Sequence, residues 1–453
     1  MPKRSTPHKP EAKPALAVPK GGKPAGARPS ARGVALELLS AVLEKKRPLD
    51  ELLEGNRPLA ALEPRDRAFA YLMTATVLRR LGQIDALIAH ALAHPLPAKA
   101  ATAQSLLRLG VAQLLFLKVP AHAAVGETVE LAEAMSWGGF KALINAVLRR
   151  LGAEGEALVA AQDAPRLNTP EWLWQSWSRA YGEVVARDIA AACLEEPPLD
   201  LTVKSNAEGW AAELGAELLP TGGLRRRAGG DVKALAGFAE GAWWVQDAAA
   251  ALPARMLGQV AGKRVLDLCA APGGKTAQLA LAGAKVTALE RSAHRLRRLA
   301  ENLARLRLSA ELVAADVELW RPDEPADAVL LDAPCTATGA LRRHPDIRHL
   351  KTPADVTRMA AEQDRLLKAA LAMLRPGGLL VYAVCSLELE EGPARIAHLL
   401  GAGAPLRRRP LEASEINGLA ELVTPEGDLR TLPCHFAERG GLDGFYACRL
   451  ERL

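Results

Sequence analysis

The spacing of apolar residues divides the sequence into a helical first part and a later part that alternates short apolar runs with helical stretches. Between residues 31 and 155, apolar residues recur every three or four positions, and no alternating strand pattern occurs. Prolines and glycines interrupt these helical faces. The pattern predicts an all-helical domain over residues 31–155, with helical faces at 34–43, 68–81, 106–117 and 143–151.

From about residue 241 the rhythm changes to fully apolar runs separated by helical stretches. Such runs are typical of buried parallel strands, and their alternation with helices predicts a doubly wound, Rossmann-like α/β domain over residues 241–453. The segment 445–450 is expected to be a final edge strand. The other predicted strands are residues 264–268, 285–289, 312–315, 328–331 and 379–384.

Residues 156–240 form a small α/β middle segment in this interpretation. Trp172, Trp174 and Trp177 fall on one helix, and we expect a docking face against the next domain rather than a platform for stacking bases. Two prolines then stop the helix, and residues 199–203 follow as a strand. The basic run at residues 225–227 is expected to be a turn.

The composition of the 453 residues, 49% apolar and 24% charged, is that of a globular protein. No run of about 18 residues is apolar enough to span a membrane, and the first residues lack the apolar stretch of a secretion signal. We therefore expect a cytoplasmic protein without membrane contact. Nothing in the sequence signals an oligomer, and we expect a monomer.

The net charge of +6 comes from the amino-terminal tail. Residues 1–32 hold eight Lys and Arg against Glu11, whereas the remaining 421 residues carry 50 basic and 51 acidic side chains. Seven prolines and few large apolar residues predict that residues 1–30 are a disordered basic tail. The tail is either a solubilising extension or attracted to nucleic acid.

Six cysteines are present, at positions 193, 269, 335, 385, 434 and 448. None forms a Cys-x-x-Cys pair, and no group of Cys and His has zinc-site spacing, so we expect reduced thiols and no metal.

The turn after the first predicted strand of the α/β domain is rich in small residues. Residues 267–276 read DLCAAPGGKT; a phosphate-binding loop would need glycine at position 269, which is Cys269, and the dinucleotide pattern GxGxxG is also absent. What remains is a strand–turn–helix at which backbone can approach a ligand closely.

Two carboxylates follow the next two strands. Glu290 is placed to accept hydrogen bonds from ribose hydroxyls, and Asp316 to accept one from an exocyclic amine such as that of adenine. Taken singly, each carboxylate could equally be a helix N-cap. Together with the small-residue turn, and without a phosphate-binding signature, they indicate a nucleoside cofactor, for which S-adenosylmethionine fits better than NAD or ATP.

Two thiols follow the last two strands of the predicted parallel sheet. Asp332-Ala333-Pro334-Cys335 ends one, and Cys385 follows the other, so both thiols should face the cofactor cleft. A thiolate that adds to C6 of a pyrimidine makes C5 nucleophilic enough to accept a methyl group. One thiolate would form this bond and a second group would help release the product, while the Asp332 carboxyl could hydrogen-bond the ring near N3. The target base must be single-stranded or flipped out.

These motifs, together with residues 341–348 (LRRHPDIR) and 244–248 (WVQDA), closely resemble those of the RNA 5-methylcytosine methyltransferases. The helical domain of residues 31–155, through its segments between residues 65 and 149, resembles the NusB family of RNA-binding domains, and the combination is similar to the bacterial RsmB-type enzymes that act on 16S rRNA. The resemblance covers about residues 31–453. It implies an RNA partner, 16S rRNA either free or in an early small-subunit particle.

The resemblance also implies roles for individual residues. Cys385 would be the nucleophile, Cys335 would assist product release, and Asp332 would act on the base. The S-adenosylmethionine site would consist of Cys269, Ala270, Ala271, Pro272, Gly273, Gly274, Lys275, Glu290, Asp316 and Asp332.

The sequence departs from the family pattern at Val384, where threonine is usual, and at Gly392, where asparagine is common. Arg342, Arg343 and His344 are expected to reach phosphates beside the target base. His122 is expected to pack at the start of a helix. Two alternatives to a 16S rRNA enzyme stay open: an enzyme with a tRNA cytosine as substrate, and a non-catalytic ribosome-assembly scaffold, which would have lost its cysteines or cofactor turn.

Overall fold

The computed structural model describes residues 29–227 and 230–453, and within them the chain divides into two compact units after Asp163. The predicted basic tail lies outside the described residues except for Pro29 and Ser30. No helix in the described ranges is long and apolar enough to cross a membrane.

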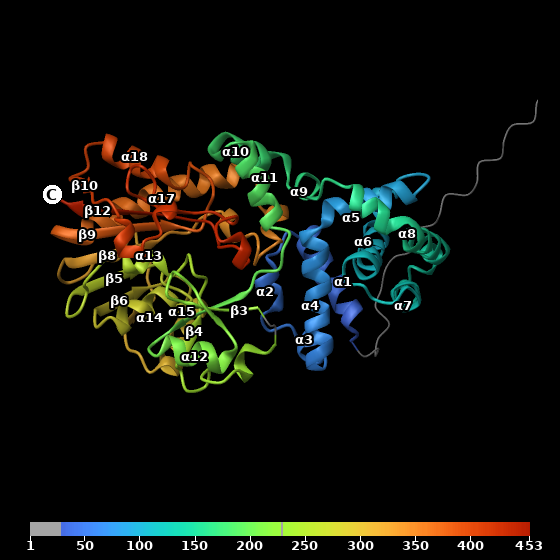
Figure 1. Cartoon of the computed structure of the whole chain (residues 1–453), viewed down its shortest axis with the longest axis horizontal. Coiled ribbons are helices and arrows are strands. Elements are labelled where there is room, and N and C mark those ends of the chain that lie inside the picture. Colours follow the sequence, from blue (N-terminus) through green and yellow to red (C-terminus); the bar gives the residue numbers. More distant parts are fainter. Residues whose placement is uncertain (1–28, 228–229) are drawn as a thin grey trace, which may run out of the picture. The chain divides into compact units, whose positions relative to one another are not determined.

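The first unit is helical throughout its described part, as the apolar spacing predicted (Figure 1). Ser30 caps the first helix by accepting the N–H of Gly33 at 3.1 Å, and Pro64 occupies the first turn of the longest early helix. His122 is exposed, so the prediction that it packs is wrong. The helices are α1 (Ala31–Leu43), α2 (Leu49–Leu53), α3 (Arg57–Ala60), α4 (Pro64–Arg79), α5 (Leu81–Ala91), α6 (Ala101–Val111), α7 (Ala121–Ala134) and α8 (Lys141–Ala161), with a π-helical turn at Ala112–Phe116 extending α6.

Helices α6 and α8 pack closely because Gly110 has no side chain. A Cβ at this position would lie 2.5 Å from Cδ1 of Leu148, which is fully buried on α8. The predicted helical faces thus meet closely here, and any larger residue at position 110 would force the buried Leu148 side chain to move.

The second unit begins with three helices and a small antiparallel sheet of order β2-β3-β1-β4. Strand β1 spans Leu199–Val203, as predicted, and β3 contains two residues of the basic run, which is therefore not a turn. The elements are α9 (Ala164–Leu167), α10 (Glu171–Tyr181), α11 (Glu183–Ala192), β1, α12 (Ala207–Leu214), β2 (Glu217–Leu218), β3 (Leu224–Arg226) and β4 (Trp243–Val245).

The tryptophans of α10 form the predicted docking face. Trp174 and Trp177 are buried in a cluster that includes Leu341 and Leu387 from the larger α/β part of the same unit. The indole N–H of Trp177 also donates to the Glu388 carboxylate at 3.2 Å. This helix is therefore anchored to the loop that follows the last parallel strand.

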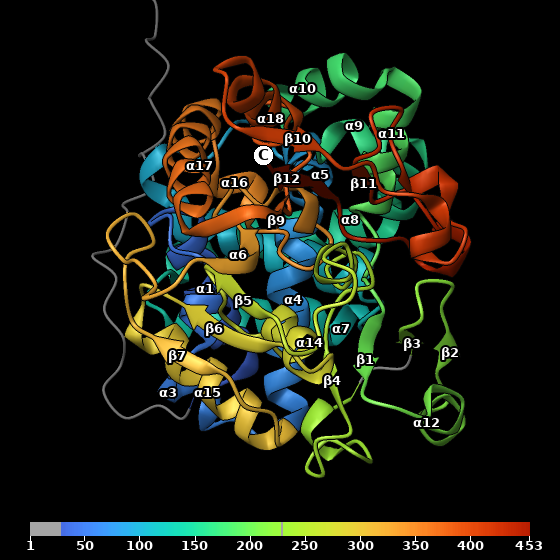
Figure 2. The same ribbon diagram turned by 90° about the vertical axis from the view of Figure 1, so that its left-hand side faces the viewer.

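The larger sheet has the order β10-β12-β9-β8-β5-β6-β7, and β11 pairs with β12 (Figure 2). The strands from β9 to β7 are parallel, and the chain reverses direction across the sheet at β5, which lies between β6 and β8. The strands are β5 (Arg264–Leu268), β6 (Lys285–Leu289), β7 (Glu311–Val313), β8 (Ala326–Asp332), β9 (Leu374–Val384), β10 (Leu406–Arg408), β11 (Leu429–Thr431) and β12 (Phe445–Arg452).

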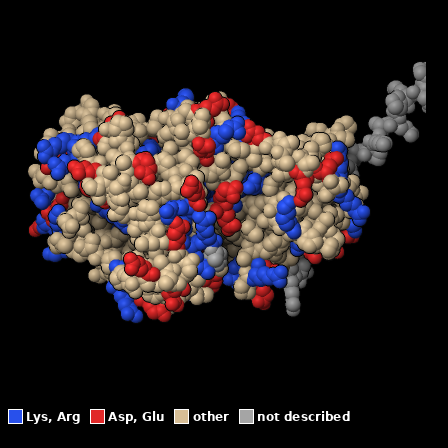
Figure 3. Space-filling model, in the orientation of Figure 1, with Lys and Arg blue, Asp and Glu red and all other residues tan. Residues whose placement is uncertain are grey.

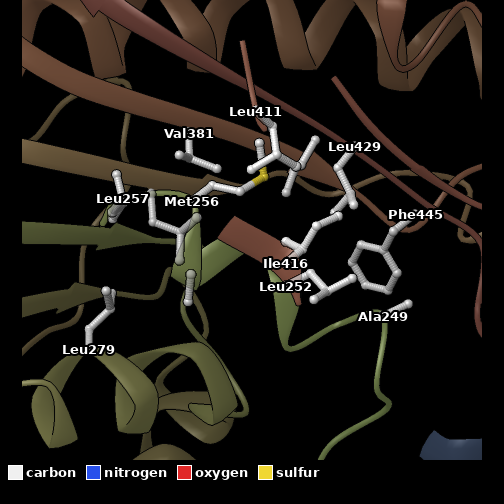
Figure 4. Close-up of a cluster of buried hydrophobic side chains, with 14 of the residues drawn as sticks. Ala249, Leu252, Met256, Leu257, Leu279, Val381, Leu411, Ile416, Leu429 and Phe445 are labelled. Carbon is white, nitrogen blue, oxygen red and sulfur yellow. The ribbon is translucent and has the colours of Figure 1, made fainter. Parts of the chain in front are cut away.

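Alternate residues of the parallel strands enter two different cores. On β8, Val329 and Leu331 pack with α17, whereas Ala328 and Leu330 belong to a cluster with Met256 and Leu279 on the other side (Figure 4). The doubly wound prediction is therefore confirmed. The helices of this part are α13 (Leu252–Arg255), α14 (Gly274–Leu281), α15 (Ala293–Leu306), α16 (Ile347–Leu350), α17 (Pro353–Met373) and α18 (Pro393–Gly401).

Strand β12 is not the edge strand that the sequence predicts. It pairs with β9 on one side and with both β10 and β11 on the other. Strands β10 and β11 have three residues each, too few to show an apolar pattern, so their pairing with β12 could not be predicted from the sequence.

Candidate active site

The turn between β5 and α14 has the backbone shape that the small residues predicted. Cys269 and Gly273 have left-handed φ angles of 62° and 99°, and a Cβ at Gly273 would lie 2.9 Å from Cγ of Leu299. Two side chains of α15 hold the turn: Arg295 donates to the carbonyl of Ala271 at 2.7 Å, and Asn302 to that of Pro272 at 3.0 Å. The turn thereby presents its backbone at the carboxyl end of β5.

Glu290 and Asp316 follow β6 and β7 and lie around one small cavity of about 80 Å³ with Cys269. Neither is the N-cap of a helix: Ser292 caps α15, and Asp316 accepts the N–H of Glu318 at 2.9 Å in a turn. The structure thus brings three of the predicted cofactor residues together.

These residues fit a nucleoside with ribose hydroxyls. The Glu290 side chain is 5% exposed, with Oε1 accepting the N–H of Ser292 and Oε2 lying 3.2 Å from Nη1 of Arg295. Among the described residues, none donates a hydrogen bond to Oε2. A buried carboxylate oxygen of this kind is suited to accept from a hydroxyl group.

Cys335 and Cys385 are brought together although 50 residues separate them. They follow β8 and β9, which are paired in parallel up to Asp332 and Ala383, and their sulfur atoms lie 3.5 Å apart. The loops are tied by backbone hydrogen bonds, including one from the N–H of Gly339 to the carbonyl of Cys385 at 3.0 Å. The predicted adjacency of the two thiols is therefore present.

A cavity of about 480 Å³ opens beside this pair, and Cys385 lines it together with Lys275 and Asp332. Lys275 Nζ lies 2.7 Å from Oδ2 of Asp332, with the two side chains 9% and 30% exposed. Burial alone would lower the pKa of Lys275, but the Asp332 carboxylate raises it above its usual value, so the ammonium stays charged. The wall of the cavity also includes Trp244, Gln246, Arg298, Asn302, Arg343 and Phe445.

The sequence grouped Lys275 with the cofactor turn. The structure places its ammonium next to Asp332 and 5.1 Å from the centroid of the Phe445 ring, in the cavity that Cys385 lines. Ala270 to Gly274 line the same cavity, whereas Cys269 lines the smaller one with Glu290. The turn thus lies between the cavity with Glu290 and Asp316, which suits a nucleoside, and the cavity that Cys385 lines.

The surroundings of the cysteines differ in ways that bear on reactivity. Hydrogen bonding to Cys385 and burial raise the pKa of Cys335 well above its usual range. Burial raises the pKa of Cys269 to about 12. Cys193 and Cys448 are buried, and Cys434 packs in the tryptophan cluster. Among the described cysteines, only Cys385 lines the cavity that contains Lys275 and Asp332.

Arg342 and Arg343 are not arranged as phosphate contacts. Arg342 is 1% exposed, which contradicts the sequence prediction for it. Arg343 lines the cavity, but its guanidinium donates to Asp443 at 3.1 Å and to Asp247 at 2.6 Å. Desolvation raises the pKa of Asp443 to about 6, while Arg343 holds the pKa of Asp247 below its usual value despite burial.

The same buried ionic network reaches the small sheet. Arg225 of β3 makes two hydrogen bonds of 2.7 Å with Asp200 of β1, and Asp200 also lies 3.7 Å from Arg343. Arg225, the first residue of the basic run at 225–227, therefore has a structural role. Sequence reasoning missed Asp200, Asp247 and Asp443, because a single aspartate in a loop or strand gives no signal of its partner.

The departures from the family pattern are accommodated locally. Val384 is fully buried in the core of β9. At Gly392, a Cβ would lie 3.0 Å from the Tyr446 ring and 3.1 Å from Arg430, so these two side chains occupy the space that an asparagine would need. Among the described residues, no group of side chains could hold a metal ion.

Comparisons with known proteins agree on both parts of the chain. Residues 254–451 match the family model described as 16S rRNA methyltransferase RsmB/F, and residues 29–153 match the NusB family. Ribosomal RNA small subunit methyltransferase B of Pseudomonas putida is 39% identical over 443 residues, covering 93% of this chain and 98% of that protein. The protein of the same name from Klebsiella pneumoniae is 38% identical over 387 residues, covering 82% and 89%.

Solved structures share the fold. The crystal structure of PH0851 superposes with a TM-score of 0.71 at 22% identity, covering 92% of this chain and 99% of that one. A methyltransferase homologue from Pyrococcus horikoshii gives a TM-score of 0.53 at 26% identity, covering 64% of this chain and 97% of that one.

Proposed function

The chain belongs to the RsmB family of ribosomal RNA small subunit methyltransferases, and we propose that it methylates C5 of a cytosine in 16S rRNA through a bond between Cys385 and C6. It is an rRNA methyltransferase that depends on S-adenosylmethionine and carries a NusB domain. The observation that carries the finer proposal is the pair of sulfur atoms 3.5 Å apart beside the cavity that holds Lys275 and Asp332.

The geometry supports Cys385 as the attacking thiol. Its side chain lines the cavity, whereas Cys335 does not and has a pKa raised by its hydrogen bond to Cys385 and by burial. A group held as a neutral thiol is a poor nucleophile, since the thiolate is the reactive form. Addition of the Cys385 thiolate to C6 places negative charge on the pyrimidine ring.

The Lys275–Asp332 pair is placed to stabilise that charge. Lys275 is held protonated, so it can donate a proton or a hydrogen bond toward N3 while Asp332 orients the ring. Phe445 and Trp244 add apolar surface against which the base can lie. A base bound in this cavity would exclude water from the reacting carbons.

The cofactor side of the turn would hold S-adenosylmethionine, which when bound supplies a methyl group on a positively charged sulfur. Glu290 would accept from the ribose hydroxyls, Asp316 from the adenine amine, and the backbone of residues 269–273 would border the remainder.

Product release requires loss of the C5 proton and cleavage of the bond between C6 and Cys385. Cys335 remains a thiol at neutral pH because its pKa is raised, and its sulfur lies 3.5 Å from that of Cys385. It can therefore pass its proton to the departing sulfur, and the Cys335 thiolate that this leaves can take the proton from C5, which restores both thiols. This role needs the two thiols to stay adjacent.

The RNA is expected to be 16S rRNA, either free or in an early small-subunit particle, and the enzyme to be a cytoplasmic monomer. On the face shown in Figure 3, basic and acidic side chains are interspersed. The wall of the cavity nearest α15 nevertheless carries Arg298 and Arg305, which are basic side chains that a flanking phosphate could contact.

The test compares wild type with Cys385→Ala, Cys335→Ala and the control Cys434→Ala on 16S rRNA and on tRNA. We expect Cys385→Ala to lose methylation and form no RNA-linked protein on denaturing gels. Cys335→Ala should accumulate such a band, and Cys434→Ala should behave as wild type. Bisulfite sequencing of the RNA locates the product at C5 of a cytosine.

Each alternative gives a different result. Normal methylation by Cys385→Ala would exclude the covalent mechanism, and an adduct with Cys385→Ala alone would mean that the thiol roles are exchanged. Methylation of tRNA in place of 16S rRNA would favour the tRNA enzyme. Absence of both methylation and S-adenosylmethionine binding in the wild type would favour the assembly scaffold.

A further inference from the structure

A buried carboxylate outside the cavity is bonded to the residues that follow the two cysteines in the chain. Glu391 belongs to the loop after β9 and is fully buried. It does not line the cavity with Cys385 or the one with Glu290. The mechanism proposed above does not use it, and no motif of the sequence analysis singled it out.

The Glu391 carboxylate is bonded to both loops that carry the cysteines. Oε1 accepts the backbone N–H of Thr336 at 2.8 Å, and Oε2 accepts the hydroxyl of Ser386 at 2.5 Å and that of Thr336. Thr336 directly follows Cys335, and Ser386 directly follows Cys385. One side chain therefore joins the two positions that determine where the sulfur atoms lie.

Surrounding groups hold Glu391 itself in place. Gln363 of α17 donates to Oε1 at 3.3 Å, and the hydroxyl of Tyr382 donates to the backbone carbonyl of Glu391 at 2.5 Å. Burial raises the pKa of Glu391, and the hydrogen bonds from Ser386 and Thr336 oppose that shift. The carboxylate is thus held in place as a hydrogen-bond acceptor between two loops that lie 50 residues apart in the chain.

We propose that Glu391 is a positioning residue that keeps Cys335 within reach of Cys385 and thereby sets the rate of product release. This inference rests on the proposed function. Of the two thiols, attack on C6 needs only Cys385, whereas release needs both sulfur atoms together. Loosening the two loops should therefore slow the second half of the reaction more than the first.

The principal variant is Glu391→Gln, with Glu390→Gln as the matched control. The amide keeps the size of the side chain but replaces one accepting oxygen with a donor, so it cannot accept from all of its present partners. Glu390 undergoes the same chemical change at an exposed position of the same loop. Losing one hydrogen bond to a charged group changes a rate by about tenfold.

The first readout is the ratio of RNA-linked enzyme to methylated RNA in single-turnover reactions. We expect Glu391→Gln to raise this ratio about tenfold and Glu390→Gln to leave it at the wild-type value. A variant that only lost folded protein would lower both quantities together and leave the ratio unchanged, and that result would overturn the proposal.

The second readout needs neither RNA nor cofactor. Diamide oxidises two neighbouring thiols to a disulfide and accepts their two hydrogen atoms. The rate at which the Cys335–Cys385 disulfide forms, measured by peptide mass spectrometry, therefore reports how often the two sulfur atoms come into contact. We expect Glu391→Gln to slow it several-fold relative to Glu390→Gln. An equal rate in the two variants would overturn the proposal even if the wild type formed no RNA adduct.

A milder variant covers the case in which Glu391→Gln does not fold. Thr336→Val removes the hydroxyl, which donates to Oε2 of Glu391 and lies 3.4 Å from the Ser386 hydroxyl, and it keeps the backbone N–H bond to Glu391. We expect a rise in the adduct ratio smaller than that of Glu391→Gln and a disulfide rate between those of Glu391→Gln and wild type. Wild-type values for both readouts would contradict the proposal.

Discussion

Two cavities lie at opposite ends of the same parallel strands, and the one that we propose as the active site is the smaller of the two. The cavity of about 480 Å³ lies at the carboxyl ends and is lined by Lys275, Asp332 and Cys385. A cavity of about 870 Å³ lies at the amino ends and is lined by residues that begin strands, such as Arg264 and Lys285. Cavity size therefore does not indicate where this enzyme acts.

The difference follows from how parallel strands end. At the carboxyl ends, each chain leaves the sheet in a loop that carries a reactive or polar side chain into a shared space. At the amino ends, no cysteine is among the described residues that line the cavity, and polar side chains pair near the surface: Arg264 forms an ion pair with Glu324, and Thr287 donates to Glu311 at 2.8 Å. Four kinds of change test this comparison.

The largest effect is expected at Lys275. Lys275→Met keeps an unbranched side chain of similar length but removes the positive charge beside Asp332 and Cys385. Removal of one preorganised electrostatic group lowers kcat by roughly 10²- to 10³-fold. Single-turnover methylation of 16S rRNA measures this; a loss of less than about fivefold would show that the ammonium does not act on the ring.

The next largest effect is expected at Glu290 and Asp316, the two carboxylates of the proposed cofactor cavity. Glu290→Gln and Asp316→Asn should each weaken S-adenosylmethionine binding by about 10- to 100-fold, because each removes a charged acceptor. Isothermal titration calorimetry with the cofactor measures this, and RNA affinity should stay unchanged. Unaltered cofactor affinity in both variants would place the nucleoside elsewhere.

The two ends of the sheet should also respond oppositely to pH. Burial raises the pKa of Asp267, near the carboxyl end of β5, to about 7, whereas a hydrogen bond from the Arg264 N–H lowers the pKa of Asp327, near the start of β8. Between the unfolded pKa of about 4 and pH 7, the folded state holds an extra proton at Asp267, so its contribution to stability falls as pH rises. Asp327 contributes stability above pH of about 4 and loses it as pH falls.

Urea unfolding of Asp267→Asn and Asp327→Asn between pH 3 and pH 8 tests these signs. Asp267→Asn cannot ionise, so its free energy of unfolding should fall less than that of the wild type between pH 5 and pH 7. Asp327→Asn should lose stability relative to wild type mainly above pH 5. Parallel curves for wild type and Asp267→Asn would contradict the burial argument.

The smallest effect is expected at the amino ends. Glu324 is 67% exposed and pairs with the half-exposed Arg264, and exposed ion pairs contribute little to stability. Glu324→Gln should leave kcat and cofactor affinity within about twofold of wild type. A large loss of methylation would mean that the cavity at the amino ends of the strands takes part in the reaction.

The sequence predicted most of the strands that build the site because buried parallel strands are continuous apolar runs. Strands β5 and β6 begin and end where these runs do. The edge position of β12 was wrong because strands of three residues leave no pattern. A short strand is defined by its partners, which the sequence does not show.

The site could be predicted only as far as residues lie at strand ends. Cys335 and Cys385 were expected to be neighbours because they follow neighbouring strands. The sequence could not place the Lys275 ammonium against Asp332, since a long side chain has many directions open to it. It also gave no sign that Glu391 lies between the loops, or that Arg342 is buried, because both depend on tertiary packing of polar loops.

The most direct test of the thiol assignment uses wild-type enzyme and 16S rRNA containing 5-fluorocytosine. Fluorine at C5 cannot leave as a proton does, so an adduct that has accepted the methyl group cannot release the enzyme. After digestion, mass spectrometry identifies which cysteine carries the nucleotide. We predict that the nucleotide is attached to Cys385; attachment to Cys335, or the absence of any covalent product while unmodified RNA is methylated normally, would contradict the account.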